Sequence, residues 1–148
     1  MKTLILFFTV LLTSAVGFAQ EGKSEMLDSY LKMKNSLING DSESVQEEAL
    51  KATTLLQSAS GFQKKNIFLK QLKKMAATND IEKQRASLSI LSAHLWEILK
   101  SDPTIERELY YNYCPMKEMY WISEFKVLKN PYYGYSMLNC GMIKETKK

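Results

Sequence analysis

The chain contains two cysteines, and each has a methionine close by in the sequence. Met116 follows Cys114 by two residues, and Cys140 follows Met137 by three, a spacing that fits one tight turn. Thiolate and thioether sulfurs form a soft ligand set that suits Cu(I) and binds Mg²⁺ or Ca²⁺ poorly. In an extended segment, residues two apart point to the same side, so we expect the sulfurs of Cys114 and Met116 to converge. The spacing therefore indicates a candidate metal site of two thiols and two thioethers.

A disulfide between Cys114 and Cys140 is the alternative interpretation. It would close a loop of about 26 residues and stabilise the fold by about 3–4 kcal/mol in the loop-entropy description. The methionines would then fill gaps in the core, a role that suits this flexible side chain. Zinc is a poor fit, because the usual Cys/His tetrad is missing from the sequence. Both interpretations require the two cysteines to be close neighbours.

His94 is the only histidine of the chain. It lies one helical turn after Leu91, at the edge of an apolar stripe, where a half-buried imidazole usually bonds to a backbone carbonyl. A role as an additional metal ligand would need the C-terminal segment to pack against this helix. The sequence carries no Ser nucleophile elbow, phosphate loop or H-E-x-x-H motif. With one histidine and no acid pair, we predict that the protein is not an enzyme and has no catalytic residues.

The first nineteen residues are typical of a cleaved signal peptide. Lys2 is their only charge, an apolar run extends over residues 4–12, and Gly17 and Ala19 occupy the minus-three and minus-one positions before Gln20. We therefore predict a periplasmic or secreted protein with no stable membrane insertion after cleavage. Such a compartment is oxidising, which permits either a disulfide or a metal site. Removing Lys2 lowers the net charge from +4 to +3, too mild a charge to predict a nucleic-acid partner.

Apolar periodicity and capping residues predict helices in the first two-thirds of the mature chain. Good caps are Ser24, Asp41 or Ser42, and Asn79 or Asp80, and good stops are Gly40 and Gly61. We expect the helices to occupy residues 24–40, 41–61, 62–80 and 81–101. A short helical turn is expected after Pro103, in residues 104–109.

From Tyr110 onward the helical periodicity ends. Tyrosines, Pro115, Asn130–Pro131 and Gly134 dominate and predict short extended pieces and turns. The expected fold is mainly α: an antiparallel bundle of about four helices, with an irregular, short-strand C-terminal segment packed against it. Residues 20–148 form one domain in this prediction, the Cys/Met-containing segment spans 110–143, and the last five residues are frayed.

Several short motifs follow one another in the C-terminal segment. They read C-P-M at 114–116, W-I-S at 121–123, N-P-Y-Y-G at 130–134 and M-L-N-C-G at 137–141. In this order they resemble the hallmark of a bacterial family of unknown function with a helical N-terminal half. Residues 84–85 (QR) and 91–92 (LS) fit the last long helix of that family. Its members occur alone behind a signal peptide or fused to periplasmic adaptor subunits of heavy-metal efflux pumps.

The resemblance implies an association with metal efflux, with periplasmic components of an efflux system as partners. We therefore expect an exported Cu(I)-binding protein with thiolate ligands Cys114 and Cys140, thioether ligands Met116 and Met137, and His94 as an additional candidate. Histidine is not a fixed feature of the family at the position of His94, which weakens that candidate. The walls of the site would be Trp121, Tyr132 and Tyr133, and its turn would be held by Asn130 and Gly134. The alternative function is a non-metal interaction module with a Cys114–Cys140 disulfide and an aromatic docking surface at residues 130–135.

Overall fold

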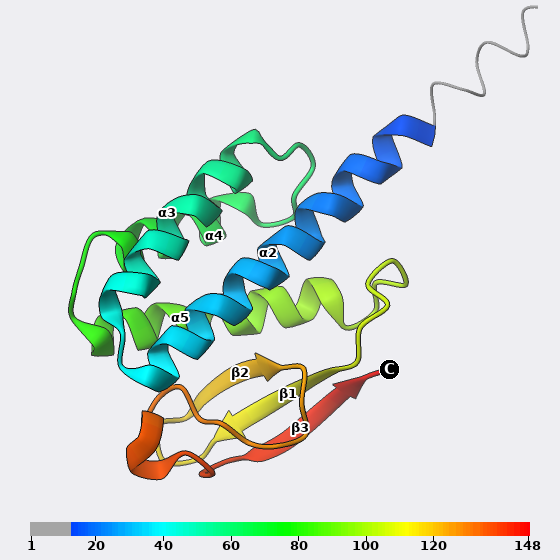
Figure 1. Ribbon diagram of the computed structural model, residues 1–148. Coiled ribbons are helices and arrows are strands. Elements are labelled where there is room, and N and C mark those ends of the chain that lie inside the picture. The colour runs from blue at the N-terminus through cyan, green and yellow to red at the C-terminus, as the bar shows by residue number, and fades with distance from the viewer. Residues whose placement is uncertain (1–12) are drawn as a thin grey trace, which may run out of the picture.

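The structure, a computed structural model, describes residues 13–148, with side chains from Gly22 onward. Four helices fill the first two-thirds of this range (Figure 1): α2 (Thr13–Asn39), α3 (Ser42–Ser58), α4 (Lys65–Ala76) and α5 (Ile81–Leu99). Among these described helices, none is both long enough and apolar enough to be a membrane span. Most of the predicted signal peptide (1–19) lies outside the described residues, and residues 13–19 are the first turns of α2.

The predicted end of α2 and the predicted starts of α3 and α5 rest on identifiable caps. The Asp41 carboxylate accepts a hydrogen bond from the backbone N–H of Ser44 at 3.0 Å. The Asp80 carboxylate does the same for the first turn of α5. Gly40 has a φ of 74°, the left-handed conformation that ends a helix. Because the connections are short, α2, α3, α4 and α5 pack as neighbours around one apolar core, as the sequence predicts.

The predicted limits of two helices are wrong. Ser24 lies inside α2, which begins upstream of it at Thr13, since no proline interrupts the segment before it. The helix expected over 62–80 is shorter and spans only Lys65–Ala76. Lys64 precedes it with a left-handed φ of 57°, and its amine pairs with Glu97 of α5. The left-handed backbone of Lys64 interrupts the helix, so α4 starts at Lys65 and not at residue 62.

The C-terminal third forms a three-stranded antiparallel sheet with strand order β2-β1-β3. Its strands are β1 (Leu109–Cys114), β2 (Met119–Ser123) and β3 (Met142–Lys147). The tail predicted to be frayed is thus the edge strand β3, and Lys147 Nζ donates a 2.9 Å hydrogen bond to the Asp102 carbonyl. The helical turn expected after Pro103 is also wrong. The Asp102 carboxylate accepts from the backbone N–H of Thr104 at 2.9 Å, a local turn that competes with helix.

The sheet has two covered faces. Tyr111, Tyr120 and Ile122 face the helices, where the Tyr111 ring stacks on Trp96 of α5 at 5.0 Å. Asn112, Cys114 and Trp121 point to the opposite face, because side chains alternate along a strand. The segment 124–141, which includes the short 3₁₀ helix η1 (Gly134–Met137), runs from β2 past the end of α2 to β3 (Figure 1). This segment covers the second face and carries Cys140.

A series of buried hydrogen bonds connects the sheet with two helices. The backbone N–H of Ile122 donates to the Tyr30 hydroxyl at 2.9 Å. That hydroxyl lies 2.7 Å from Ser92 Oγ, which in turn donates to the Leu88 carbonyl. Tyr30 belongs to α2 and Ser92 to α5, so these hydrogen bonds join α2, α5 and β2. The sheet is therefore an integral layer of the fold.

Candidate functional site

The two cysteine thiols lie next to each other. Cys114 ends the central strand β1 and is buried, whereas Cys140 is half-buried in the turn before β3. Both are free thiols, and they lie close enough to interact. Burial, together with the neighbouring Cys114, raises the pKa of the Cys140 thiol. Cys140 is therefore protonated at neutral pH, and a metal ion would have to displace that proton.

Asn130 organises the loop that carries Cys140. Its side-chain amide donates to the Cys140 carbonyl at 2.6 Å, and its Oδ1 accepts from the backbone N–H of Tyr132 at 2.8 Å. Its own backbone N–H donates to the Leu138 carbonyl at 2.7 Å. Asn130 is fully buried, so water does not compete for these hydrogen bonds. The role predicted for Asn130 in the turn is confirmed.

Two glycines allow the loop to pack closely against its surroundings. A Cβ atom on Gly134, whose φ is 55°, would lie 2.8 Å from the Ile38 carbonyl oxygen at the end of α2. A Cβ atom on Gly141 would lie 2.5 Å from the Trp121 ring. The residue after Cys140 thus rests directly on Trp121, one of the predicted walls of the site. Tyr132 also contacts the indole in an edge-on arrangement, at 6.2 Å between ring centroids.

Arg85 clamps the same loop to the helices, a role that the sequence pattern did not show. Its Nε donates to the Pro131 carbonyl at 2.8 Å, and its Nη2 donates to the Leu37 carbonyl at 3.4 Å. Gln84 beside it donates to three backbone carbonyls, those of Ser42, Met75 and Thr78. The only hint in the sequence is a pair of polar residues at inward-facing positions of an otherwise apolar helix stripe.

The methionines occupy turns at the surface. Met116 lies in the β1–β2 turn with 62% of its surface exposed, so the expectation of an extended Cys114–Met116 segment is wrong. Pro115 begins that turn directly after the strand. The alternation of side chains between the two faces of the strand, on which the expectation rested, therefore ends at Cys114. Met137 is 38% exposed, and its carbonyl accepts from the Cys140 N–H at 3.1 Å, as a tight turn requires. The two thiols are thus close to each other, whereas both thioethers lie near solvent.

His94 is half-buried on α5, but its polar neighbours are side chains and not the backbone carbonyl expected from the sequence. Its Nδ1 lies 3.3 Å from Lys64 Nζ and 3.8 Å from Glu97 Oε2. These contacts belong to the α4–α5 junction. Within the described residues, no group of three or more His, Cys, Asp or Glu side chains has an arrangement suited to a metal ion. A ligand role for His94 would require it to leave this junction.

The aromatic residues of the segment 130–135 differ in their exposure. Tyr132 is enclosed, and its hydroxyl donates to the Tyr120 carbonyl. Tyr133 is half-buried, with Lys117 Nζ 5.2 Å from its ring centroid. Tyr135 is exposed, and its hydroxyl donates to Asn39 Oδ1 at 3.1 Å. Only Tyr135 presents most of its ring to a partner.

Comparison with known proteins identifies the family of the chain. The family described as "Protein of unknown function (DUF3347)" matches residues 26–106, which is 81 of the 148 residues. The chain belongs to the DUF3347 family. The match covers most of α2 and all of α3, α4 and α5, and it ends before Cys114, so the C-terminal motifs lie outside it. No curated protein and no solved structure matches this DUF3347 chain.

Proposed function

We propose that this DUF3347 protein is an exported soft-metal-binding protein that holds Cu(I) at Cys114 and Cys140. The supporting observation is the contact between two thiols that are 26 residues apart in the sequence. The resemblance of the C-terminal motifs to proteins associated with heavy-metal efflux supports a role in metal delivery or sensing. Its partners would then be periplasmic components of an efflux system.

The donor set fits Cu(I) better than the other common metal ions. Two adjacent thiols provide soft ligands, whereas Mg²⁺ and Ca²⁺ require clusters of oxygen ligands. Structural zinc sites take four protein ligands, and the described residues offer no such cluster. Met116 and Met137 are the candidates for additional thioether ligands, since each follows or precedes a cysteine on a surface turn.

The surroundings of the two thiols also support the proposal. Cys114 is part of the central strand, and the Asn130 amide fixes the backbone of Cys140. Preorganised ligands lose little freedom on binding. Cys140 is half-buried and so remains reachable from solvent. Binding would release the thiol protons, so affinity should rise with pH until both thiols are ionised.

The thiol contact also favours a second candidate function, an interaction module with a disulfide. Oxidation would remove two electrons and two protons from the pair and join the sulfurs at about 2.05 Å. The locked loop would then present Tyr135 and the neighbouring apolar side chains. Metal binding and disulfide formation exclude each other at the same sulfurs, which makes them separable by experiment.

Competition of the reduced protein, residues 20–148, with a Cu(I) chelator tests the proposal. We expect one Cu(I) per chain, and Cys114→Ser or Cys140→Ser should lower the affinity by more than about a hundredfold, beyond the usual effect of an outer-shell change. Met137→Leu should cost less, because a thioether carries no charge. Met142→Leu is the matched control, since Met142 is similarly exposed but lies on β3. Equal Cu(I) affinity of the wild type and the double Cys→Ser variant would exclude the site.

A further inference from the structure

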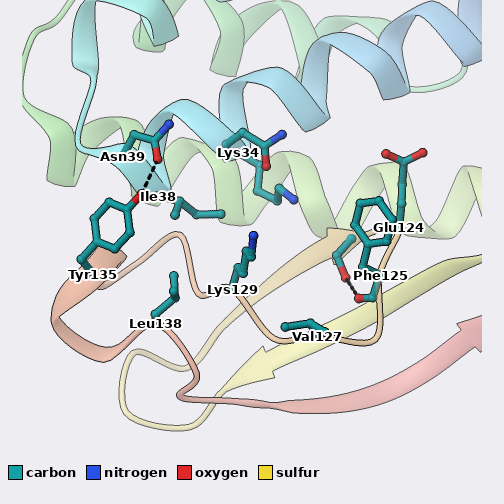
Figure 2. A pocket seen from close by; sticks show the side chains of 11 residues that line it. Lys34, Ile38, Asn39, Glu124, Phe125, Val127, Lys129, Tyr135 and Leu138 are labelled. Carbon is teal, nitrogen blue, oxygen red and sulfur yellow. Dashed lines mark hydrogen bonds between the residues drawn. The ribbon is translucent and has the colours of Figure 1, made fainter.

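A hollow separates the C-terminal half of α2 from the loop that follows β2. Its volume is about 590 Å³, within the range of small-molecule sites. Figure 2 shows its main lining: Lys34 and Ile38 from α2, Phe125, Val127 and Lys129 from the loop, and Tyr135 from η1. The hollow is distinct from the thiol pair, and neither cysteine lines it.

Lys34 is the unusual residue of this hollow. Only 7% of its surface is exposed, yet its amine has no hydrogen-bond or ion-pair partner within the described part of the chain. The other buried lysine, Lys147, donates to the Asp102 carbonyl. Most of the side chain is buried while the residue borders the hollow, and this burial lowers the pKa of Lys34 to about 8. An amine kept in this state points to a partner that comes from outside the chain.

The surrounding charges make the hollow electropositive. Lys129 approaches from the opposite loop, and Figure 2 shows the two amines converging on the same space. Glu124 is the acidic residue of the lining, but its carboxylate already accepts hydrogen bonds from Arg107. Arg107 also donates to Asp28 at 2.6 Å. Lys34 and Lys129 therefore have no carboxylate of their own, and an anion would complement them.

An apolar wall lies beside the two amines. Phe125 and Val127 are 71% and 65% exposed, respectively, although both are large apolar residues on a short loop. The Ser123 hydroxyl donates to the Phe125 carbonyl at 3.0 Å and so holds the start of this loop in place. Ile38 and Leu138 extend the apolar surface across the hollow. Adjacent cationic and apolar surfaces match a ligand that carries one anionic group on an apolar body.

We propose that this hollow binds a small amphipathic carboxylate. The carboxylate would lie between the amines of Lys34 and Lys129 and give Lys34 the counter-ion that it lacks. The apolar body would cover Phe125 and Val127 and remove their side chains from water. The amide of Asn35, which also lines the hollow, provides a further donor for the carboxylate. This site is independent of Cu(I), because no residue of the thiol pair takes part.

Titration of residues 20–148 with octanoate, followed by calorimetry and by NMR shifts of the lining residues, tests the proposal. We expect saturable binding at one site, at least tenfold weaker binding to Lys34→Met, and unchanged binding to Lys126→Met. Lys126 is exposed on the same loop and does not line the hollow, so it controls for net charge. Phe125→Ser should weaken the binding of octanoate and leave that of acetate unchanged.

Two uncharged or truncated probes separate the contributions of charge and apolar surface. Octanol lacks the carboxylate and acetate lacks the long alkyl chain, so both should bind at least tenfold more weakly than octanoate. The proposal fails if octanoate does not saturate, if Lys34→Met binds it as well as the wild type, or if octanol binds equally well. Met has nearly the length of Lys without the charge, and far-UV circular dichroism checks that the variant keeps its fold.

Discussion

At the scale of single residues, Asn130 and Lys34 show two different solutions for a buried polar group. The side chain of Asn130 has partners for both its amide and its carbonyl oxygen, and it stabilises the loop around Cys140. The amine of Lys34 has none within the described residues, although it is nearly as buried. Satisfied buried groups are typical of structural roles. Unsatisfied ones mark places where stability and function compete.

Replacing Lys34 by Met should stabilise the protein at neutral pH. Burial lowers the pKa of Lys34 to about 8 in the folded state, with a partly offsetting attraction from Glu124 and a small repulsion from Lys129. The unfolded chain therefore binds more protons between about pH 8 and pH 10.5, and the stability of the wild type should rise with pH in that window. We expect Lys34→Met to raise the free energy of unfolding at pH 7 by up to about 3 kcal/mol. Urea denaturation at pH 7 and pH 10 measures this difference, which should shrink at pH 10.

Lys129→Met is the control for that measurement, because Lys129 is exposed and its charge costs little. Its free energy of unfolding should stay within about 0.5 kcal/mol of the wild type. A Lys34→Met variant that is less stable than the wild type at pH 7 would show that the amine has a stabilising partner.

At the scale of elements, the segment 124–141 differs from the rest of the fold. It contains the single-turn helix η1 and otherwise no regular structure, yet it carries Cys140 and lines the hollow. Side-chain hydrogen bonds from Asn130 and Arg85 hold it, and Gly134 and Gly141 let it approach α2 and Trp121. The geometry of both candidate sites therefore depends on a few bonds and not on a strand ladder.

Asn130→Ala should loosen this segment. The change leaves the Cys140 carbonyl and the Tyr132 N–H without their partner, and we expect a loss of about 1–3 kcal/mol per orphaned group in the free energy of unfolding. Oxidant-driven bond formation between Cys114 and Cys140 should also become slower, since Cys140 is no longer held against β1. Urea denaturation and thiol trapping over time measure the two effects. Asn66→Ala removes an exposed amide on α4, away from this segment, and should change neither.

At the scale of the whole molecule, buried contacts join the helical part and the sheet, and we expect the two to unfold together. Tyr30 connects α2, α5 and β2 through buried hydrogen bonds, and Trp96 stacks on Tyr111 of β1. The DUF3347 match covers the helices, whereas both thiols lie in the sheet and its covering loop. A change at the thiols should therefore alter the melting of the complete domain.

The melting temperature in three states tests this coupling: oxidised, reduced, and reduced with Cu(I). Reduction should cost about 3–4 kcal/mol if a disulfide forms in the oxidised protein, because the bond closes a loop of about 26 residues. Cu(I) should restore most of that stability, by about 2.7 kcal/mol at a hundredfold excess over Kd. One ion would tie the same two chain positions as the disulfide. If reduction lowers the melting temperature and Cu(I) leaves it unchanged, the cysteines act only as a structural bond.

The amino-acid sequence determined the features that depend on neighbouring residues along the chain. Asp41 and Asp80 cap helices because a carboxylate reaches N–H groups two or three positions later. The apolar periodicity of α3 and α5 specified their inner faces in the same way. The meeting of Cys114 and Cys140 was also expected, since either use of a cysteine pair requires it. Local chemistry was sufficient for the caps and the inner faces, whereas the meeting of the cysteines was inferred from the two uses that such a pair can have.

Only the tertiary structure decided the features that depend on what packs against a residue. The residues of β3 are almost all exposed, so pairing with β1 and not an apolar pattern makes them a strand. Met116 is not part of the expected extended segment, because it lies in the turn that joins β1 to β2. Lys34 and Lys32 look alike in the sequence, but the loop after β2 covers only Lys34. Burial is set by distant segments, and it alone distinguishes a solvated lysine from a candidate ligand-binding one.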